Sequence, residues 1–244
     1  MQGIDAAIID LDGTLVDTLG DFVAALELMR GDLTERGFVT SPLAADQVIE
    51  MVGKGSENLV KSALNHFNSL HALVNIACGA INSEANTVFA LARYLAHYEV
   101  ISGQHAALYP GVLDGLRAAQ AAGLVMACVT NKPVAFAQPL LQHLGLAGFF
   151  SHVFGGDSFA RKKPDPTPLL KTCDALGTLP ARTLMVGDSS NDAEAARAAG
   201  CPVVLVTYGY NHGQPIRAVD ADGWVDSLAD LFELFKPAAL SAPA

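Results

Sequence analysis

Cysteines and basic residues are scarce in this chain of 244 residues, and each shortage excludes a class of protein. The four cysteines are scattered, and no two of them form a Cys-x-x-Cys pair: Cys78, Cys128, Cys173 and Cys201. We therefore expect reduced, mostly buried thiols in a cytoplasmic protein, and no disulfides. The 15 Lys and Arg residues against 25 Asp and Glu residues leave a formal net charge of −10. A nucleic acid is not an expected partner, because binding to its backbone needs basic residues.

Long apolar runs and leader-like segments are also lacking. No apolar stretch is long enough to span a bilayer, so no membrane partner is expected. The N-terminus carries no basic segment and Asp10 interrupts the first apolar run, so no signal peptide is expected. The low-complexity segment 237–244 is expected to be frayed.

Hydrophobic residues, by contrast, make up 51% of the chain, enough for one α/β domain or for one domain with a smaller insertion. From residue 109 onward, short apolar runs alternate with amphipathic segments. This alternation predicts a parallel sheet with helices on both faces. The expected strands cover 6–9, 124–129, 149–154, 183–186, 203–206 and 223–225. The expected helices cover 112–122, 167–176, 191–199 and 228–235, and another ends at Leu144.

Residues 19–98 differ, because they show helical periodicity and no segment that predicts a strand. Phe22, Leu26 and Met29 recur at helical spacing. Three more helices are expected, one after Ser41-Pro42 and two over 58–67 and 86–98. The predicted fold is therefore α/β. A Rossmann-like parallel core comprises 1–18 and 107–244, and an all-helical domain, 19–106, is inserted after the first strand.

Two carboxylates, Asp10 and Asp12, follow the first expected strand. Residues two apart in a strand share a face, unless the turn at Gly13 rotates the second one. Adjacent carboxylates repel each other, and a hard cation such as Mg²⁺ would hold both. The alternative is an ordinary turn, in which Asp caps the turn and Gly supplies a positive φ. For an isolated Asp-x-Asp-Gly, the turn is the more frequent explanation.

Three more polar clusters each follow an expected strand. They are Thr130/Asn131, Lys162/Lys163 and Asp188/Asp192. In a parallel sheet the carboxyl ends of the strands lie at one edge, so all four clusters should converge there. This convergence, and not any single cluster, predicts a site.

Each of these clusters also has a purely structural explanation. Thr130 and Asn131 suit a helix N-cap as well as a phosphate site at a helix N-terminus. Lys162 and Lys163 could be solvated surface charges, although the proline after Lys163 fixes its direction and favours it as the functional residue. Asp192 could merely stabilise a helix N-terminus, whereas Asp188 lies directly at a strand end, as Asp10 does.

The order of these motifs resembles the haloacid dehalogenase superfamily. The matching segments are Asp10 to Thr18 (Asp-x-Asp-Gly-Thr-Leu-Val-Asp-Thr), Val129 to Pro133, Lys163 to Pro166 and Gly187 to Asp192. The helical insertion resembles the cap domain of that superfamily. Four further segments extend the resemblance to bacterial phosphoglycolate phosphatases over nearly the whole chain: Val52 to Gly55, Leu95 to Tyr98, Tyr109 to Val112 and Val206 to Asn211.

The resemblance implies a catalytic role for each motif. Asp10 would be the nucleophile that forms an aspartyl-phosphate. Asp12 would protonate the leaving alkoxide and then activate water. Lys163 would neutralise the charge of the nucleophile and the phosphate, while Thr130 and the amide of Asn131 hold the phosphoryl oxygens. This is covalent catalysis combined with electrostatic stabilisation of the transferring group.

The resemblance also implies a metal and a subclass. Asp10, the Asp12 carbonyl and Asp188 would bind Mg²⁺, and Asp192 would order the ligands around it. Dehalogenases of the superfamily lack an acid at the position of Asp12, and its transporting ATPases have Thr there. The chain therefore resembles the phosphatases and phosphomutases.

The expected substrate is a small phosphorylated metabolite, 2-phosphoglycolate first among them. We expect the turn Gly53-Lys54-Gly55 to reach the substrate, because glycines allow close approach, and Lys54 to contact the substrate carboxylate. Related phosphatases often have Asn where this chain has Lys54, and solvation of Lys54 is the equal alternative. Other small-molecule phosphatases, a pyrophosphatase and a hexose phosphomutase are the enzymatic alternatives.

A non-catalytic alternative is a phospho-acceptor or binding module that uses the same acidic pocket. Receiver domains also place Asp at strand ends, but they lack a cap and need no acid at Asp12. Turnover of p-nitrophenyl phosphate would distinguish the two. The chain is expected to be a monomer or a homodimer.

Overall fold

The structure is a computed structural model that describes residues 3–73 and 81–233, so Cys78 and the tail 237–244 lie outside the described residues. A six-stranded sheet forms its centre, in the order β5-β4-β1-β6-β7-β8, and every neighbouring pair is parallel. The strands are β1 (Ala6–Ile9), β4 (Val125–Val129), β5 (His152–Phe154), β6 (Thr183–Gly187), β7 (Val203–Val206) and β8 (Gly223–Val225). The predicted α/β fold class is confirmed.

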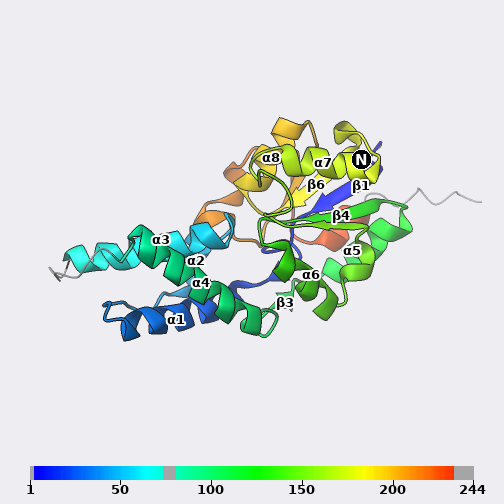
Figure 1. Cartoon of the computed structure of the whole chain (residues 1–244). Coiled ribbons are helices and arrows are strands. Elements are labelled where there is room, and N and C mark those ends of the chain that lie inside the picture. Colours follow the sequence, from blue (N-terminus) through cyan, green and yellow to red (C-terminus); the bar gives the residue numbers. More distant parts are fainter. Residues whose placement is uncertain (1–2, 74–80, 234–244) are drawn as a thin grey trace, which may run out of the picture.

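Helices cover both faces of this sheet (Figure 1). The helices are α5 (Val112–Ala121), α6 (Val134–His143), α7 (Thr167–Leu176), α8 (Ser190–Ala199) and α9 (Leu228–Glu233). In β1, Ala7 and Ile9 pack with α5, α6 and α9, whereas Ile8 packs with α7 and α8. Successive strand residues point to opposite faces, so a strand buried on both sides must be apolar throughout, as β1 is.

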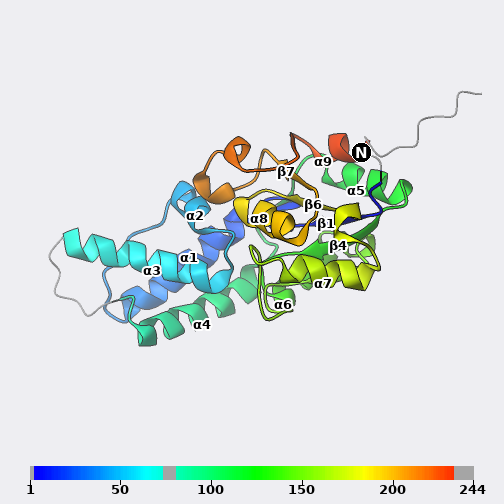
Figure 2. The same ribbon diagram turned by 90° about the horizontal axis from the view of Figure 1, so that it is seen from above.

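Four helices form a second unit with its own hydrophobic core. They are α1 (Leu19–Glu35), α2 (Ala45–Met51), α3 (Ser56–Leu73) and α4 (Glu84–Ile101). Figures 1 and 2 show these helices together at one end of the molecule, with the sheet at the other. The buried rings of Phe22, Tyr94 and Tyr98 stack where this unit meets the sheet domain, and Tyr98 also contacts Phe136 of α6.

Some element boundaries differ from the prediction. The strand expected over 149–154 covers only His152–Phe154, because a short 3-10 helix occupies Ala147–Phe149. The helix expected after Ser41-Pro42 begins at Ala45, and that expected from residue 58 begins at Ser56. These shifts lie at element ends, where local sequence signals are weakest.

The chain passes between the two units through a short antiparallel ribbon that the sequence analysis did not predict. Its strands are β2 (Val16–Asp17) and β3 (Ala107–Leu108), each of two residues. Val16 pairs with Leu108, and Asp17 pairs with Ala107. Beside this ribbon, the buried carboxylate of Asp21 accepts hydrogen bonds from the backbone N–H groups of Gly103 (2.7 Å) and His105 (2.8 Å). Both crossings therefore lie side by side.

Candidate active site

The polar residues after the three central strands line one cavity. Strands β4, β1 and β6 are neighbours in the sheet, so Thr130, Asp10 and Asp188 follow adjacent carboxyl ends. The volume of this cavity is about 40 Å³, enough for a few water molecules. The helical unit contributes Phe22, Val52, Gly53, Gly55, Ser56, Leu59, Tyr94 and Tyr98 to its wall. Asp10/Asp12, Thr130/Asn131 and Asp188 therefore converge as predicted. Lys162 does not, because it lines two separate surface depressions and its Nζ donates to the Lys54 carbonyl at 2.7 Å.

Lys163 is buried behind this cavity and joins two carboxylates. Its Nζ lies 2.9 Å from Asp10 Oδ1 and 2.7 Å from Asp192 Oδ1, and it donates to the Val129 carbonyl at 2.7 Å. The contact with Asp10 is an ion pair without hydrogen-bond alignment. Burial alone would lower the pKa of Lys163, but the Asp10 and Asp192 carboxylates outweigh it and raise the pKa above its usual value. Lys163 is therefore a permanent cation beside Asp10.

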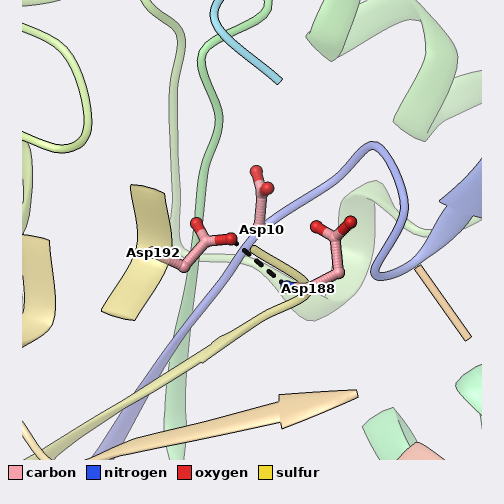
Figure 3. A group of neighbouring side chains, drawn as sticks. All are labelled: Asp10, Asp188 and Asp192. Atoms are coloured by element: carbon pink, nitrogen blue, oxygen red, sulfur yellow. Dashed lines mark hydrogen bonds between the residues drawn. The ribbon is translucent and has the colours of Figure 1, made fainter. Parts of the chain in front are cut away.

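Asp10, Asp188 and Asp192 form a compact acidic cluster (Figure 3). One oxygen from each carboxylate lies within 4.8 Å of the others, and all three residues are buried. Burial, followed by the Asp192 and Asp12 charges, raises the pKa of Asp10 to about 7 against the opposing effect of Lys163. Burial, Asp192 and Asp10 likewise raise the pKa of Asp188 well above its usual value. Hard carboxylate oxygens at this spacing fit a divalent cation such as Mg²⁺.

Asp192 has partners at both of its carboxylate oxygens. While Oδ1 pairs with Lys163, Oδ2 accepts from the Ser189 hydroxyl (2.7 Å) and from the backbone N–H groups of Ser189 (3.1 Å) and Asp188 (3.2 Å). The helix-capping interpretation is therefore confirmed, and a role of Asp192 around a metal stays a prediction. Asp192 holds the loop that carries Asp188 in place.

Asp188 has partners that the sequence analysis did not single out. The Thr14 hydroxyl donates to its Oδ1 at 3.2 Å, and the Tyr210 backbone N–H donates to its Oδ2 at 2.7 Å. Gly209 lies so close that any Cβ there would overlap the Asp188 side chain. Both partners lie in segments noted for the resemblance alone, Thr14 in Asp10 to Thr18 and Tyr210 in Val206 to Asn211.

Asp12 lines the same cavity, but its side chain turns away from the acidic cluster. Its Oδ1 accepts from Lys132 Nζ (2.7 Å) and from the Thr18 hydroxyl (2.8 Å). Gly13 follows with φ of +84°, so the turn rotates the second carboxylate, as the sequence analysis left open. Lys132 is the functional candidate that the sequence analysis missed, although it stands directly after Thr130-Asn131.

Thr130 and Asn131 are both buried at the end of β4. The Thr130 hydroxyl oxygen accepts from the Lys132 N–H at 3.1 Å, which leaves its O–H to donate elsewhere. The Asn131 side chain donates to the carbonyls of Gly53 (2.9 Å) and Lys163 (2.8 Å). Neither side chain caps α6, which begins at Val134 with Pro133 at its N-cap position and no side-chain cap, so the N-cap interpretation is wrong.

The turn Gly53-Lys54-Gly55 of the helical unit lies against the sheet domain. The Gly53 carbonyl also accepts from Asn191 Nδ2 (3.1 Å), and the Val52 carbonyl is 2.7 Å from His212 Nδ1. Gly53 and Gly55 line the cavity, whereas the exposed Lys54 lines a separate surface depression. A contact between Lys54 and substrate stays a prediction.

The sequence model of the haloacid dehalogenase-like hydrolases matches residues 4–200, and the chain belongs to this family. Among its relatives is a phosphoglycolate phosphatase of Thiobacillus denitrificans, 41% identical over 231 residues that cover 93% of each chain. The phosphoglycolate phosphatase of Nitrosospira multiformis is 41% identical over 236 residues, 96% of each chain. The crystal structure of a predicted phosphoglycolate phosphatase from Haemophilus somnus superposes with a TM-score of 0.87 at 31% identity, covering 97% of this chain and 100% of that one.

The fold, the site and these relatives together define the chain as a phosphatase. Both relatives are named phosphoglycolate phosphatase, and the substrate in that name is a small phosphorylated molecule. Among the described residues, no helix has the length and apolar character needed to cross a membrane.

Proposed function

We propose that this phosphatase hydrolyses 2-phosphoglycolate to glycolate and phosphate, with Mg²⁺ and through an aspartyl-phosphate on Asp10. The observation that carries the proposal is the position of Asp10, beside the buried cation Lys163 and at the wall of a small cavity that Asp12 and Asp188 also line. The small cavity favours a small phosphate ester. The relatives named phosphoglycolate phosphatase support the choice of substrate.

In the first step, an Asp10 oxygen attacks phosphorus, and the bond between phosphorus and the ester oxygen breaks. Asp12 donates its proton to that oxygen, and glycolate leaves. In the second step Asp12 accepts a proton from water, whose oxygen attacks the phosphoryl group and frees Asp10 and inorganic phosphate. Lys163 balances the negative charge on Asp10 and the phosphoryl oxygens, and Thr130 and the Asn131 amide bind those oxygens.

Asp10, Asp188 and the Asp12 carbonyl would hold the Mg²⁺ ion, with Asp192 keeping Asp188 in position. The ion, when bound, would neutralise the carboxylates and the transferring phosphoryl group. The raised pKa values of Asp10 and Asp188 support this assignment, because a cation offsets the repulsion that burial makes severe.

Removal of divalent cations is expected to abolish activity. Without a cation, the acidic cluster repels a phosphate dianion and favours protonation of Asp10, which removes the nucleophile. Phosphatase rates are measured in excess EDTA and again after Mg²⁺ is restored in excess, with Ca²⁺ addition as the comparison. Full turnover in a protein shown to be metal-free by elemental analysis would refute the metal requirement.

Residues 19–106 act as a cap that closes over the core of 1–18 and 107–244, and the β2–β3 ribbon is the hinge. Closure excludes water from the reacting groups.

The protein is cytoplasmic, which the buried free thiols of Cys128, Cys173 and Cys201 support, and it acts as a monomer or homodimer.

A screen of phosphorylated metabolites with Mg²⁺ tests the substrate. We expect phosphoglycolate to have the highest kcat/KM, above hexose phosphates and pyrophosphate, because the cavity is small. Ethyl phosphate serves as the matched ester that lacks a carboxylate. If phosphoglycolate ranks low while other esters turn over well, the protein is a phosphatase for a different substrate.

A further inference from the structure

Lys132 stands out among the residues that line the active-site cavity. Among the described residues in this wall, Lys132 is the only lysine or arginine, and the same wall holds three aspartates, Asp10, Asp12 and Asp188. Its side chain is almost fully buried. A substrate with two anionic ends needs positive charge at both, and Lys163 lies at the phosphoryl end beside Asp10. Lys132 is the cation left for the other end.

The surroundings of Lys132 hold its ammonium group in place. Nζ lies 2.7 Å from Asp12 Oδ1, 4.7 Å from the centre of the Phe22 ring and 4.9 Å from the centre of the Tyr98 ring. Phe22 comes from α1 and Tyr98 from α4, so the two rings belong to the helical unit. The rings attract the cation and keep water away from it. The described residues give this Nζ one hydrogen-bond acceptor, Asp12, and an ammonium has three N–H donors.

The position of Lys132 beside Asp12 indicates which part of the substrate Lys132 contacts. A general acid must lie within about 2.6–3.2 Å of the oxygen that it protonates. If Asp12 protonates the ester oxygen, the Lys132 ammonium is a close neighbour of that oxygen and of the atoms attached to it. In phosphoglycolate, the carboxylate carbon is separated from the ester oxygen by a single methylene group. A carboxylate at this distance can reach Lys132, whereas Lys54 lines a different depression.

We propose that Lys132 binds the substrate carboxylate. It thereby makes this phosphatase prefer phosphate esters in which a single methylene group separates the carboxylate carbon from the ester oxygen. The inference rests on the proposed function and adds the residue that selects the substrate. The Phe22 and Tyr98 rings position the ammonium group. Lys132 belongs to the sheet domain, so it is held in this position only when the helical unit packs against that domain.

Two non-hydrolysable ligands with carbon chains of equal length test this role without turnover. 3-Phosphonopropionate matches phosphoglycolate in length, and propylphosphonate replaces its carboxylate with a methyl group. Affinities are measured by calorimetry with Mg²⁺ for the wild type and for Lys132→Met. We expect the wild type to prefer 3-phosphonopropionate. In the Lys132→Met variant, the affinity for 3-phosphonopropionate should fall about 10- to 100-fold, the scale of a lost charge-assisted hydrogen bond. The affinity for propylphosphonate should fall by less than about 3-fold.

Three further variants make the comparison specific. Lys132→Arg keeps the charge and should retain most of the preference. Lys171→Met removes a lysine from the exposed surface of α7 and should leave both affinities unchanged. Lys54→Met tests the competing residue and should also leave the preference in place. If Lys132→Met does not fold, as judged by circular dichroism, Lys132→Gln replaces it in the same comparison.

The outcomes separate this inference from the proposed function. If the wild type prefers 3-phosphonopropionate and the Lys132 variant keeps that preference, the role of Lys132 is wrong and the substrate proposal stands. The same conclusion follows if Lys54→Met removes the preference. If both ligands weaken equally in Lys132→Met, the residue acts only through Asp12 and the proposed carboxylate contact is wrong. If the wild type shows no preference, phosphoglycolate is not the substrate and the inference falls with it.

Discussion

The Asp10→Asn variant is expected to lose turnover by at least about 10⁴-fold, the scale seen when a covalent nucleophile is removed. An amide is a poor nucleophile, and the other two carboxylates of the acidic cluster are not placed to replace Asp10. Asp188 is held by Thr14 and Tyr210, and Asp192 by Lys163 and Ser189. The fold should survive, because Lys163 keeps its contacts with Asp192 and the Val129 carbonyl.

The measurement has two parts. Turnover of phosphoglycolate and p-nitrophenyl phosphate gives the loss in rate, and acid quenching of labelled reactions detects the phosphoenzyme, which the variant should not form. Asp174→Asn, an exposed carboxylate on α7, is the matched control and should behave as the wild type does. Mass spectrometry must show that the introduced asparagine has not deamidated to aspartate. Appreciable turnover in such a preparation would exclude the covalent mechanism.

The Asp12→Asn variant is expected to lose about 10²- to 10⁴-fold in the rate of phosphoglycolate hydrolysis, the usual contribution of a general acid. The amide oxygen can still accept from Lys132 and Thr18, so the side chain should keep its position. The chemical reason for the loss is that glycolate alkoxide needs a proton to leave. p-Nitrophenolate needs none, so its departure should be affected far less.

Rapid-mixing experiments distinguish the two roles of Asp12. With p-nitrophenyl phosphate, the variant should release about one equivalent of p-nitrophenolate per site in a fast burst. Slow turnover should follow, because Asp12 is also the base for the second step. An Asp12→Asn enzyme without a burst, or one that slows both leaving groups equally in the first step, would contradict the assignment of Asp12 as the proton donor.

Much of the sheet domain was predictable from local sequence. The bounds of β1, β7, β8 and α7 agree with the prediction, because buried strands and amphipathic helices impose periods that short segments record. The positions of Asp10, Thr130 and Asp188 at one edge followed from the same reasoning, because parallel strands align their carboxyl ends. Among the described residues, Cys128, Cys173 and Cys201 are free and buried, as the scarce and scattered cysteines of the sequence led us to expect.

The sequence by itself therefore determined which residues stand at the strand ends, since strand periodicity and turn chemistry act over a few residues. Only the tertiary structure decided what those residues meet. Asp12 turns to Lys132, 120 positions away, and Lys132 in turn lies beside Phe22 and Tyr98 from two helices of the other unit. The β2–β3 ribbon joins segments that are too short to show any period. Such contacts depend on how separately folded units pack together, and no local pattern along the chain encodes that packing.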